Sequence, residues 1–354
     1  MSEYLISTNP AKSYEEIGRI PVSTLDQIKS AVAAARKALP SWKALSTEKR
    51  ASYIKKIANL LSSQLDEIAA LQTKEMGKPI SESIGECKGI IYWLNWQADN
   101  APRILAQRVL DKMDTHQTEL HFEPYGVAAV IAPWNYPSYQ MFLGVTQALL
   151  AGNTVVFKHS EECSLTAELI ASIIADSEVP SGVFNIIYGG GEVGKQLLDQ
   201  EINLIHFTGS SLVGEQVYKK AAEKFIPVVL EMGGSSPAIV YKDVDITKVA
   251  KSVYDERFSN CGQICCALKR LIVHESIYDE LTNKLKEVIS SQVIGDPLAK
   301  DTTLGPLVAK RQLMLLEKQV KDAIDKGAVI ETGGERPDNL DGAFYKPTLL
   351  TNVS

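Results

Sequence analysis

The segment FSNCGQICCALKR, residues 258–270, holds three of the chain's five cysteines, Cys261, Cys265 and Cys266. Thiols this close together suggest a metal site, a disulfide framework, buried packing residues or a nucleophile. The spacing lacks the CxxC pattern of zinc knuckles, and adjacent cysteines seldom both reach one tetrahedral ion, so we expect no metal site. A nucleophilic cysteine needs a helix N-terminus or a positive neighbour, and inert burial is the common alternative.

Two other segments place candidate catalytic groups where a strand is expected to end. In LEMGGSSP, Glu231 precedes two glycines, and a partly buried carboxylate there could act as a general base. A surface glutamate is the alternative. In APWNYP, two prolines hold Asn135 in a rigid turn, and a rigid side-chain amide can donate to an oxyanion. A simple turn-forming asparagine is the alternative there.

Two glycine-containing loops are candidates for binding the phosphates of a dinucleotide. FTGSSLVG follows an expected strand and opens a helix, so Ser210 and the N–H groups between Gly209 and Gly214 could face a pyrophosphate. YGGGEVG matches GxGxxG from Gly189 to Gly194, a pattern that is weak alone. Because the loops follow successive strands, a dinucleotide is favoured over two purely structural turns.

A lysine and an acid follow another expected strand, in VVFKHSEE. Lys158 ends the strand and Glu161 comes soon after it. A carboxylate just beyond a strand end can accept hydrogen bonds from ribose hydroxyls and would repel a 2′-phosphate. The same carboxylate would also be favoured at a helix N-terminus by the helix dipole, so the residues alone leave both interpretations open.

The elements that must position these groups follow from hydrophobic periodicity. The first hundred residues read as helices, including residues 25–39 and one long helix over 47–76, with Ser46 as its N-cap and Gly77 at its end. From Gly126 onward, short β-branched runs alternate with helical stretches, which is typical of a parallel sheet covered on both faces. The expected strands of this sheet are 126–132, 154–158, 183–189, 203–209 and 228–234.

Two domains are expected from this pattern and from a length of 354 residues. Residues 1–110 and 126–233 would form a doubly wound, dinucleotide-binding α/β domain. Residues 234–354 would form a second α/β domain, with strands at 237–241 and 270–275 and helices from Asp245 and over 276–292. The alternating segment at 111–125 reads as a β-ribbon between the two parts of the first domain, 1–110 and 126–233.

Composition excludes several classes of function. The formal net charge of −6, with lysine and arginine spread along the chain, argues against nucleic-acid binding. The most apolar window, 126–152, is broken by Pro133 and Pro137, so we expect no membrane span. No signal peptide is recognisable at the N-terminus, and cysteines without one suggest free thiols in a reducing compartment, hence a cytoplasmic protein.

Five segments, in this order, resemble the motifs of the aldehyde dehydrogenase superfamily across essentially the whole chain: PWNYP, the strand ending at Lys158, FTGSSLVG, EMGGSSP and GQIC. The separation of Glu231 and Cys265 also matches that of the family's base and nucleophile. LQTKEMGKPISES and EPYGVAAVIAPWNYP are similar to segments of short bacterial members of the succinate-semialdehyde type.

The resemblance implies an NAD(P)-dependent aldehyde dehydrogenase with Cys265 as its nucleophile, while Cys261 and Cys266 shape the pocket or pack. The Asn135 amide and the Cys265 backbone N–H would hold the oxyanion. Glu231 would activate the water that releases the acid, and its presence argues against the CoA-acylating branch. The substrate would be a small aldehyde, with succinic semialdehyde as the leading candidate.

The resemblance also implies the cofactor contacts. Glu161 matches the acid that faces the ribose 2′-hydroxyl in similar enzymes, which favours NAD, with NADP still possible. Gln312 matches a ribose-contacting glutamine. The other expected cofactor residues are Ile131, Ala132, Pro133, Trp134, Lys158, Gly190, Gly191, Gly194, Phe207, Thr208, Gly209, Ser210, Val213, Gly214, Met232 and Gly233.

The chain stops at FYKPTLLTNVS, whereas similar proteins continue through a Glu-Ile-Phe-Gly-Pro motif and further strands. We therefore expect a C-terminally truncated catalytic domain, poor activity and aggregation through open sheet edges. The ribbon at 111–125 resembles part of the family's oligomerisation arm, and the full-length protein would be a homodimer or homotetramer. The alternative function is a catalytically impaired, nucleotide-binding fragment of such an enzyme. A cysteine hydrolase would need a histidine paired with the thiol, and no family-like context for one is present.

Overall fold

The computed structural model describes residues 3–353, and its internal contacts divide the chain into two compact units. The first unit holds residues 3–7, 19–68 and 84–232, and the second holds residues 8–18, 69–83 and 233–353. The sequence assigned 8–18 and 69–83 to the dinucleotide-binding domain, whereas their contacts group them with the second unit. The functional assignment of the two units stays a prediction.

The first unit is built on one parallel sheet of five strands in the order β7-β6-β5-β8-β9. Each of the five expected strands is confirmed; β6 has the expected bounds and the other four are slightly shorter: β5 (Val127–Ile131), β6 (Thr154–Lys158), β7 (Phe184–Ile187), β8 (Leu204–Gly209) and β9 (Val228–Met232). Strands β5 and β6 are almost completely buried, as expected for a sheet covered on both faces.

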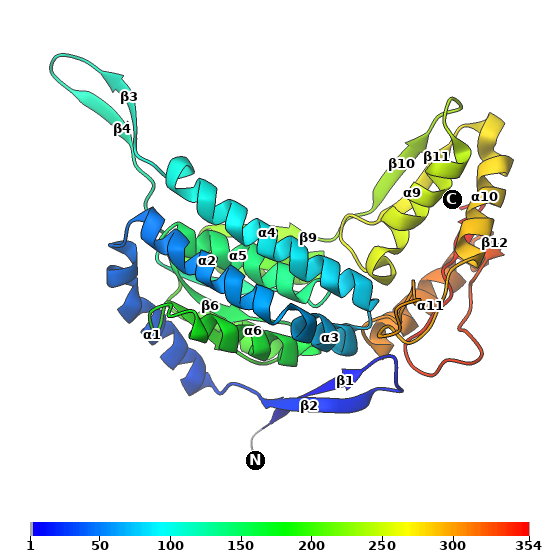
Figure 1. The fold of residues 1–354 in the computed structure, drawn as a ribbon, viewed down its shortest axis with the longest axis horizontal. Coiled ribbons are helices and arrows are strands. Elements are labelled where there is room, and N and C mark those ends of the chain that lie inside the picture. The colour runs from blue at the N-terminus through cyan, green and yellow to red at the C-terminus, as the bar shows by residue number, and fades with distance from the viewer. Residues whose placement is uncertain (1–2, 354) are drawn as a thin grey trace. The chain divides into compact units, whose positions relative to one another are not determined.

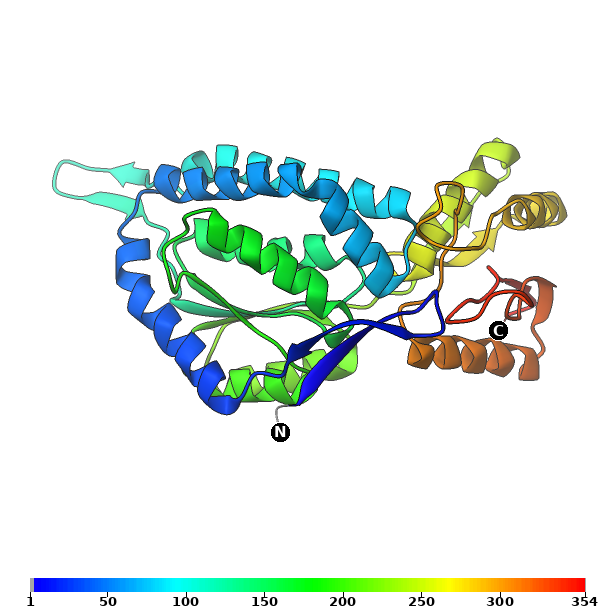
Figure 2. The ribbon, with the colours of Figure 1, turned by 60° about the horizontal axis from the view of Figure 1, so that its bottom comes forward.

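Helices cover both faces of this sheet (Figure 2). One face is covered by α5 (Pro137–Leu150) and α6 (Ser164–Asp176), with α2 (Thr47–Ser63) packed outside them. The other face is covered by α1 (Leu25–Lys43), α7 (Gly191–Asp199) and α8 (Ser211–Lys224), whose apolar side chains share one core with alternate residues of the strands. The predicted doubly wound α/β fold is therefore confirmed.

The N-terminal hundred residues differ from the prediction in two respects. Helices were expected throughout, but residues 4–9 and 15–21 form strands. The expected helix over 47–76 is two helices, α2 and α3 (Leu65–Met76), because the backbone leaves the helical region at Gln64, with φ −116° and ψ 18°. Ser46 is the N-cap as predicted, since its hydroxyl accepts the Lys49 N–H at 3.3 Å. Gly77 ends α3 with a φ of +87°, before α4 (Ile80–Ile104) begins.

A two-stranded hairpin of β3 (Arg108–Lys112) and β4 (Gln117–Leu120) extends away from the rest of the first unit (Figure 1). The sequence placed a ribbon at 111–125, so the hairpin begins and ends earlier than expected. All its strand residues are exposed except Leu120, which is half-buried. An isolated hairpin is at best marginally stable in water, so this element is suited to packing against a further surface.

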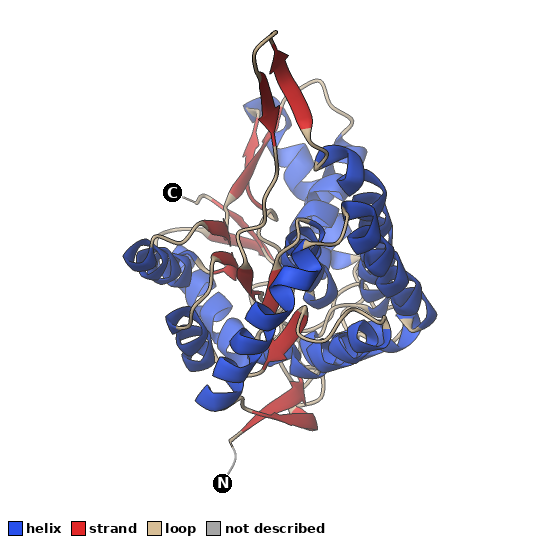
Figure 3. Ribbon diagram, turned by 90° about the vertical axis from the view of Figure 1, so that its left-hand side faces the viewer, coloured by secondary structure: helices blue, strands red, loops and turns tan. Residues whose placement is uncertain are grey.

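The second unit contains short sheets flanked by helices (Figure 3). The predicted strands and helices after residue 234 are present as β10 (Ser236–Val240), α9 (Ile246–Phe258), β11 (Leu268–Val273) and α10 (Tyr278–Ser290). β10 and β11 are parallel, and their inner residues share a core with α9 and α10. The remaining elements of the second unit are α11 (Lys310–Asp325) and the antiparallel pair β12 (Val329–Thr332) and β13 (Leu349–Thr351). Two N-terminal strands, β1 (Tyr4–Asn9) and β2 (Glu15–Pro21), pair with each other, and their residues are divided between the two units.

Within residues 3–353, no helix is long and apolar enough to span a membrane. The same residues contain no group of three or more His, Cys, Asp or Glu side chains that could hold a metal ion.

Candidate active site

The carboxyl ends of the five parallel strands meet along one edge of the sheet. In the strand register, Ile131 lies beside both Lys158 and Phe207, and Glu231 lies beside Thr208. The strand order reverses between β5 and β8, because the chain moves outward through β6 and β7 and then returns to the other side of β5. Ligands of open α/β sheets bind at such a reversal. Most of the predicted cofactor residues therefore lie together at the expected edge.

The loop that carries Asn135 runs from the end of β5 to the start of α5, where Pro137 is the first helical residue. Side chains from three other elements hold this loop. The Nε2 of His159 lies 3.1 Å from the Pro137 carbonyl oxygen, the Cys163 thiol donates to the Trp134 carbonyl at 3.5 Å, and the Tyr139 N–H donates to Glu86 Oε1 at 2.9 Å. The half-buried amide at position 135 is thus fixed from both sides of the turn.

His159 is a buried residue that the sequence reading did not single out. Since its Nε2 faces a carbonyl oxygen, Nε2 carries the proton and the ring is neutral. Burial lowers the pKa of His159 from 6.5 to about 4, and the neighbouring Lys158 acts in the same direction. This histidine links the end of β6 to the Asn135 loop. Its only sequence signal was its position directly after a predicted strand.

Lys158 is almost fully buried at the end of β6, and its Nζ lies 3.8 Å from Glu161 Oε2. Burial lowers the pKa of the Lys158 ammonium, and Glu161 opposes the shift. Glu161 opens a short 3₁₀ turn capped by Ser160, so the helix-dipole interpretation is consistent with the structure. Its side chain is 44% exposed, which leaves the carboxylate accessible to a ligand hydroxyl as well.

The loop after β8 combines a helix N-terminus with close packing. Ser210 caps α8 and accepts the Val213 N–H at 3.4 Å. A Cβ on Gly209 would lie 2.5 Å from a ring carbon of Phe207, and one on Gly214 would lie 2.5 Å from the Met232 Sδ. These two glycines are therefore required by packing, whether or not a phosphate binds. The hydroxyl of Thr208 is buried and has no hydrogen-bond partner in the described chain.

The glycines at the start of α7 (Gly191–Asp199) differ in how tightly they are packed. Gly190 is the N-cap of α7, and a Cβ on Gly190, Gly191 or Gly194 would meet no atom within 4 Å. In contrast, a Cβ on Gly189 would lie 2.2 Å from Val193, so Gly189 is needed for packing. This helix N-terminus has room for a ligand, as the prediction that Gly190, Gly191 and Gly194 contact the cofactor requires.

Glu231 lies near the end of β9, the edge strand of the sheet, and its side chain is exposed. The sequence left two possibilities, a partly buried base and a surface carboxylate. In the structure the Glu231 side chain is exposed, as is that of Met232 beside it. Its charge still acts on His206 in the next strand, opposing the lowering of the His206 pKa by burial.

The cysteine loop of the second unit has an unusual backbone. After α9, three consecutive residues, Asn260, Cys261 and Gly262, have φ angles of +52°, +55° and +78°. Cys265 and Cys266 then occupy the centre of a turn closed by the Ala267 N–H, which donates to the Ile264 carbonyl at 3.2 Å, and β11 follows. Non-glycine residues with positive φ are uncommon and persist where surrounding contacts enforce them.

The environments of the three thiols differ. Cys261 is partly buried, and burial, assisted by the Glu82 charge, raises the pKa of its thiol. Cys265 and Cys266 are both exposed. Burial and the neighbouring Cys265 raise the pKa of the Cys266 thiol. A raised pKa leaves less thiolate at neutral pH on Cys261 and Cys266. The assignment of the nucleophile among the three thiols stays a prediction. No disulfide forms among the five cysteines, all within residues 3–353.

Gly233 and Gln312 complete the predicted set, and Gly234 is the glycine next to Gly233. A Cβ on Gly234 would lie 3.1 Å from the Cys265 carbonyl oxygen, so this glycine allows the backbones to approach, whereas Gly233 meets nothing within 4 Å. Gln312 is half-buried in the first turn of α11. Gly233, Cys265 and Gln312 belong to the second unit, and the other predicted site residues belong to the first.

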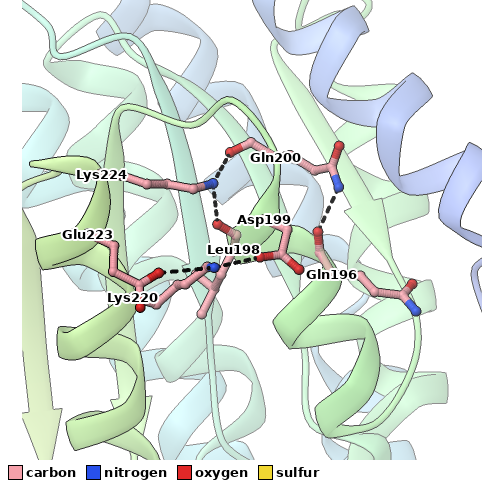
Figure 4. A network of polar contacts seen from close by, with 7 residues as sticks. All are labelled: Gln196, Leu198, Asp199, Gln200, Lys220, Glu223 and Lys224. Carbon is pink, nitrogen blue, oxygen red and sulfur yellow. Dashed lines mark hydrogen bonds and ion pairs between the residues drawn. The ribbon is translucent and has the colours of Figure 1, made fainter.

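A separate cavity of about 570 Å³ lies at the opposite, amino ends of β8 and β9. Lys224 lines this cavity, and its Nζ donates to the carbonyls of Leu198 and Gln200 at 2.7 and 2.9 Å (Figure 4). Lys220, which does not line it, pairs with Asp199 and Glu223. This network ties α7 to α8. The network stabilises the packing of these two helices and lies away from the carboxyl edge of the sheet.

Comparison with known proteins agrees with this geometry. The family model described as "Aldehyde dehydrogenase family" matches residues 2–354. This chain belongs to the aldehyde dehydrogenase family. It is 34% identical to "Succinate-semialdehyde dehydrogenase [NADP(+)] GabD" of Escherichia coli over 98% of this chain and 72% of that protein, and 38% identical to "Aminoaldehyde dehydrogenase 2, peroxisomal" of Pisum sativum over 98% and 71%. A crystal structure of PnpE with nicotinamide adenine dinucleotide superposes with a TM-score of 0.95 at 28% identity, covering 98% of this chain and 72% of that one.

These comparisons confirm the predicted family, the α/β fold and the class of NAD(P)-dependent aldehyde dehydrogenases. The expected nicotinamide cofactor also agrees with the relatives, since one is named for NADP⁺ and another was crystallised with NAD. The roles of individual site residues stay predictions.

Residues that hold the two loops were missed by the sequence reading. Glu82, Asn260 and Gln263 are polar residues in or near the loop of Cys265, and Glu86 and His159 serve the loop of Asn135. Gln263 had a signal as part of the GQIC motif, and His159 had a weaker one in its position directly after a predicted strand. The others are joined to their loops by tertiary contacts that no local pattern contains.

Proposed function

We propose that this protein oxidises a small aldehyde to the carboxylic acid with NAD or NADP, using Cys265 as a covalent nucleophile. The observation that carries the proposal is the exposed Cys265 at the centre of a turn, in a chain of this family, between thiols whose pKa values are raised. A covalent route divides one difficult oxidation into two easier steps.

The first step is attack on the aldehyde carbon. The exposed Cys265 thiol gives its proton to solvent water, its sulfur forms a bond to the carbon, and the carbonyl π electrons move onto oxygen. The Asn135 amide and the Cys265 backbone N–H donate to this oxyanion. The turn between Pro133 and Pro137 holds the amide rigidly, so little reorganisation is required when charge develops.

The residues at the carboxyl edge suit a dinucleotide. The capped N-terminus of α8, the open N-terminus of α7 and the buried cation of Lys158 offer N–H groups and positive charge to phosphates and ribose. Glu161 supports a preference for NAD, because its carboxylate would repel a 2′-phosphate. A nicotinamide ring held by these residues would supply the hydride acceptor for the oxidation, and the acyl group would then remain on Cys265 as a thioester.

The last step is hydrolysis of the thioester. Glu231 takes a proton from water, the resulting hydroxide attacks the thioester carbon, and the C–S bond breaks to return the Cys265 thiolate and release the acid. The exposed position of Glu231 at a strand end gives its carboxylate access to solvent water.

A semialdehyde is the proposed substrate class, with succinic semialdehyde first. Two relatives are named as succinate- and glutarate-semialdehyde dehydrogenases, each 34% identical to this chain. We further propose a cytoplasmic homo-oligomer, in which the exposed hairpin of β3 and β4 supplies part of the subunit contact.

The test is the production of reduced cofactor from a panel of aldehydes, followed by absorbance with NAD and with NADP. Cys265→Ser should abolish even the first turnover. Glu231→Gln should leave a single burst of reduced cofactor with little steady-state turnover, because the thioester accumulates. Cys266→Ser is the matched control and should retain both phases. Normal turnover by Cys265→Ser would overturn the proposal, and loss of the burst in Cys266→Ser alone would move the nucleophile to position 266.

A further inference from the structure

The left-handed turn before Cys265 depends on contacts from outside the loop. Glu82 Oε2 accepts the Asn260 N–H at 2.6 Å, at the first of the three positive-φ residues. A hydrogen bond from a backbone N–H to a carboxylate is charge-assisted and stronger than one between neutral groups. Glu82 therefore fixes the point at which the chain leaves α9 and enters the turn.

The other end of the turn is fixed by Gln263. Its Nε2 donates to the Asn260 carbonyl at 3.2 Å, and its Oε1 accepts the Val308 N–H at 3.0 Å. Arg257 Nη1 also donates to the Gly262 carbonyl at 3.2 Å. Since only Ile264 separates Gln263 from Cys265, the thiol and its backbone N–H are oriented by a turn held at both ends.

Glu82 itself is anchored within the second unit. The segment before it is locked by backbone contacts: the Ile80 N–H donates to the Pro297 carbonyl at 2.8 Å, and a Cβ on Gly305 would lie 1.9 Å from the Gly77 carbonyl oxygen. The carboxylate is thus presented to the cysteine loop by a rigid support, as a positioning group requires.

We propose that Glu82 is a positioning residue for the nucleophile: by holding the Asn260 N–H it sets the left-handed turn and thereby the direction of the Cys265 thiol and backbone N–H. This inference rests on the proposed role of Cys265. Glu82 takes no part in the chemistry. It acts through the backbone of residues 260–263.

The experiment compares Glu82→Ala, Glu82→Gln and an exposed control, Glu67→Ala on α3. The first readout is the rate of alkylation of Cys265 by iodoacetamide across a range of pH, without cofactor, with the modified cysteine identified by peptide mass. The second is kcat per titratable Cys265. The third is the dissociation constant of NAD.

Glu82→Ala should slow alkylation of Cys265 and lower kcat by about 10- to 100-fold, because small misplacements of a reacting group have effects of this size. NAD affinity should change by less than about twofold, since the expected NAD contacts are carried largely by the other unit. Glu82→Gln keeps an oxygen acceptor of the same reach and should recover most of the rate. Glu67→Ala should match the unmodified protein.

A purely structural role would lower the fraction of folded protein but leave the rate per titratable Cys265 unchanged, and that result would overturn the inference. If Glu82→Ala does not fold, Glu82→Asp, whose carboxylate falls one methylene short, should show the slower alkylation. Unchanged alkylation in every Glu82 variant, with Cys265→Ser still inactive, would refute the positioning role alone. Activity in Cys265→Ser would instead refute the proposed function.

Discussion

The loop of Asn135 and the loop of Cys265 are positioned in two different ways. The first runs from a buried parallel strand into a helix, so regular backbone hydrogen bonds set its two ends, and the side chains of His159, Cys163 and Glu86 hold it as well. The second leaves a helix through three residues with positive φ and depends on Glu82 and Gln263, which hold it through side-chain contacts. Both loops use side-chain contacts, but of the two only the loop of the exposed thiol has a left-handed backbone that such contacts must enforce.

The largest effect should follow from removing the amide in the first loop. Asn135→Ala should lower kcat by about 10²–10³-fold, because one oxyanion donor is typically worth this much. The strand and helix around it should remain, so binding of NAD should be unchanged. Steady-state kinetics with Asn339→Ala, an exposed residue of the second unit, as the control would check this. A loss smaller than tenfold would mean that the oxyanion is held by other groups.

The next effect is a loss of stability in acid, and it arises from His159, which holds the loop of Asn135. The pKa of His159 is about 4 in the folded chain and 6.5 ordinarily, so its neutral form is favoured by folding. The associated stability is fully present above pH 6.5 and is lost as pH falls from 6.5 towards 4, by about 3 kcal/mol in all. Burial lowers the pKa of His206 in the same direction.

Urea unfolding at a series of pH values measures this dependence. His159→Gln should flatten the slope between pH 6.5 and 4, whereas His116→Gln, on the exposed turn of the hairpin, should leave it unchanged. An unaltered slope in His159→Gln would show that another buried group, such as His206, controls acid stability.

A smaller effect is expected where the cofactor loop follows β8. Gly209→Ala would place a Cβ 2.5 Å from the Phe207 ring and should destabilise the protein by about 1–3 kcal/mol, with weaker NAD binding. Gly190→Ala meets no atom within 4 Å and should change stability by less than about 0.5 kcal/mol. Thermal unfolding of the two variants would measure the effect of each glycine on stability, and titration with NAD would measure its effect on cofactor binding. Equal stability of the two variants would contradict the packing argument.

The smallest effect concerns the second cysteine of the turn. Cys266→Ala should change kcat by less than about threefold, because that thiol has a raised pKa and no assigned role in the reaction. Single-turnover measurements would check this against the unmodified protein. A loss comparable to that of Asn135→Ala would show that the turn needs both cysteines.

The same contrast explains what could be predicted from the sequence. The five strands and the edge carrying Lys158, Gly209 and Glu231 follow from short β-branched runs between helical stretches, a local pattern. Two other features could not be predicted. The break at Gln64 is a change of backbone angles without a glycine or proline to signal it. The hydrogen bond from Asn260 to Glu82 joins residues that are far apart in the chain. The exposure of Glu231 was also undecided, since burial at a sheet edge depends on what covers it.

The bracing of the cysteine loop limits how its chemistry could be transferred. The peptide FSNCGQICCALKR contains the sulfur but neither Glu82 nor the Val308 N–H that Gln263 requires. Grafted into another scaffold, it would relax to ordinary backbone angles and present a thiol in no fixed direction. An artificial enzyme that borrows this nucleophile would have to import three separate stretches of chain together.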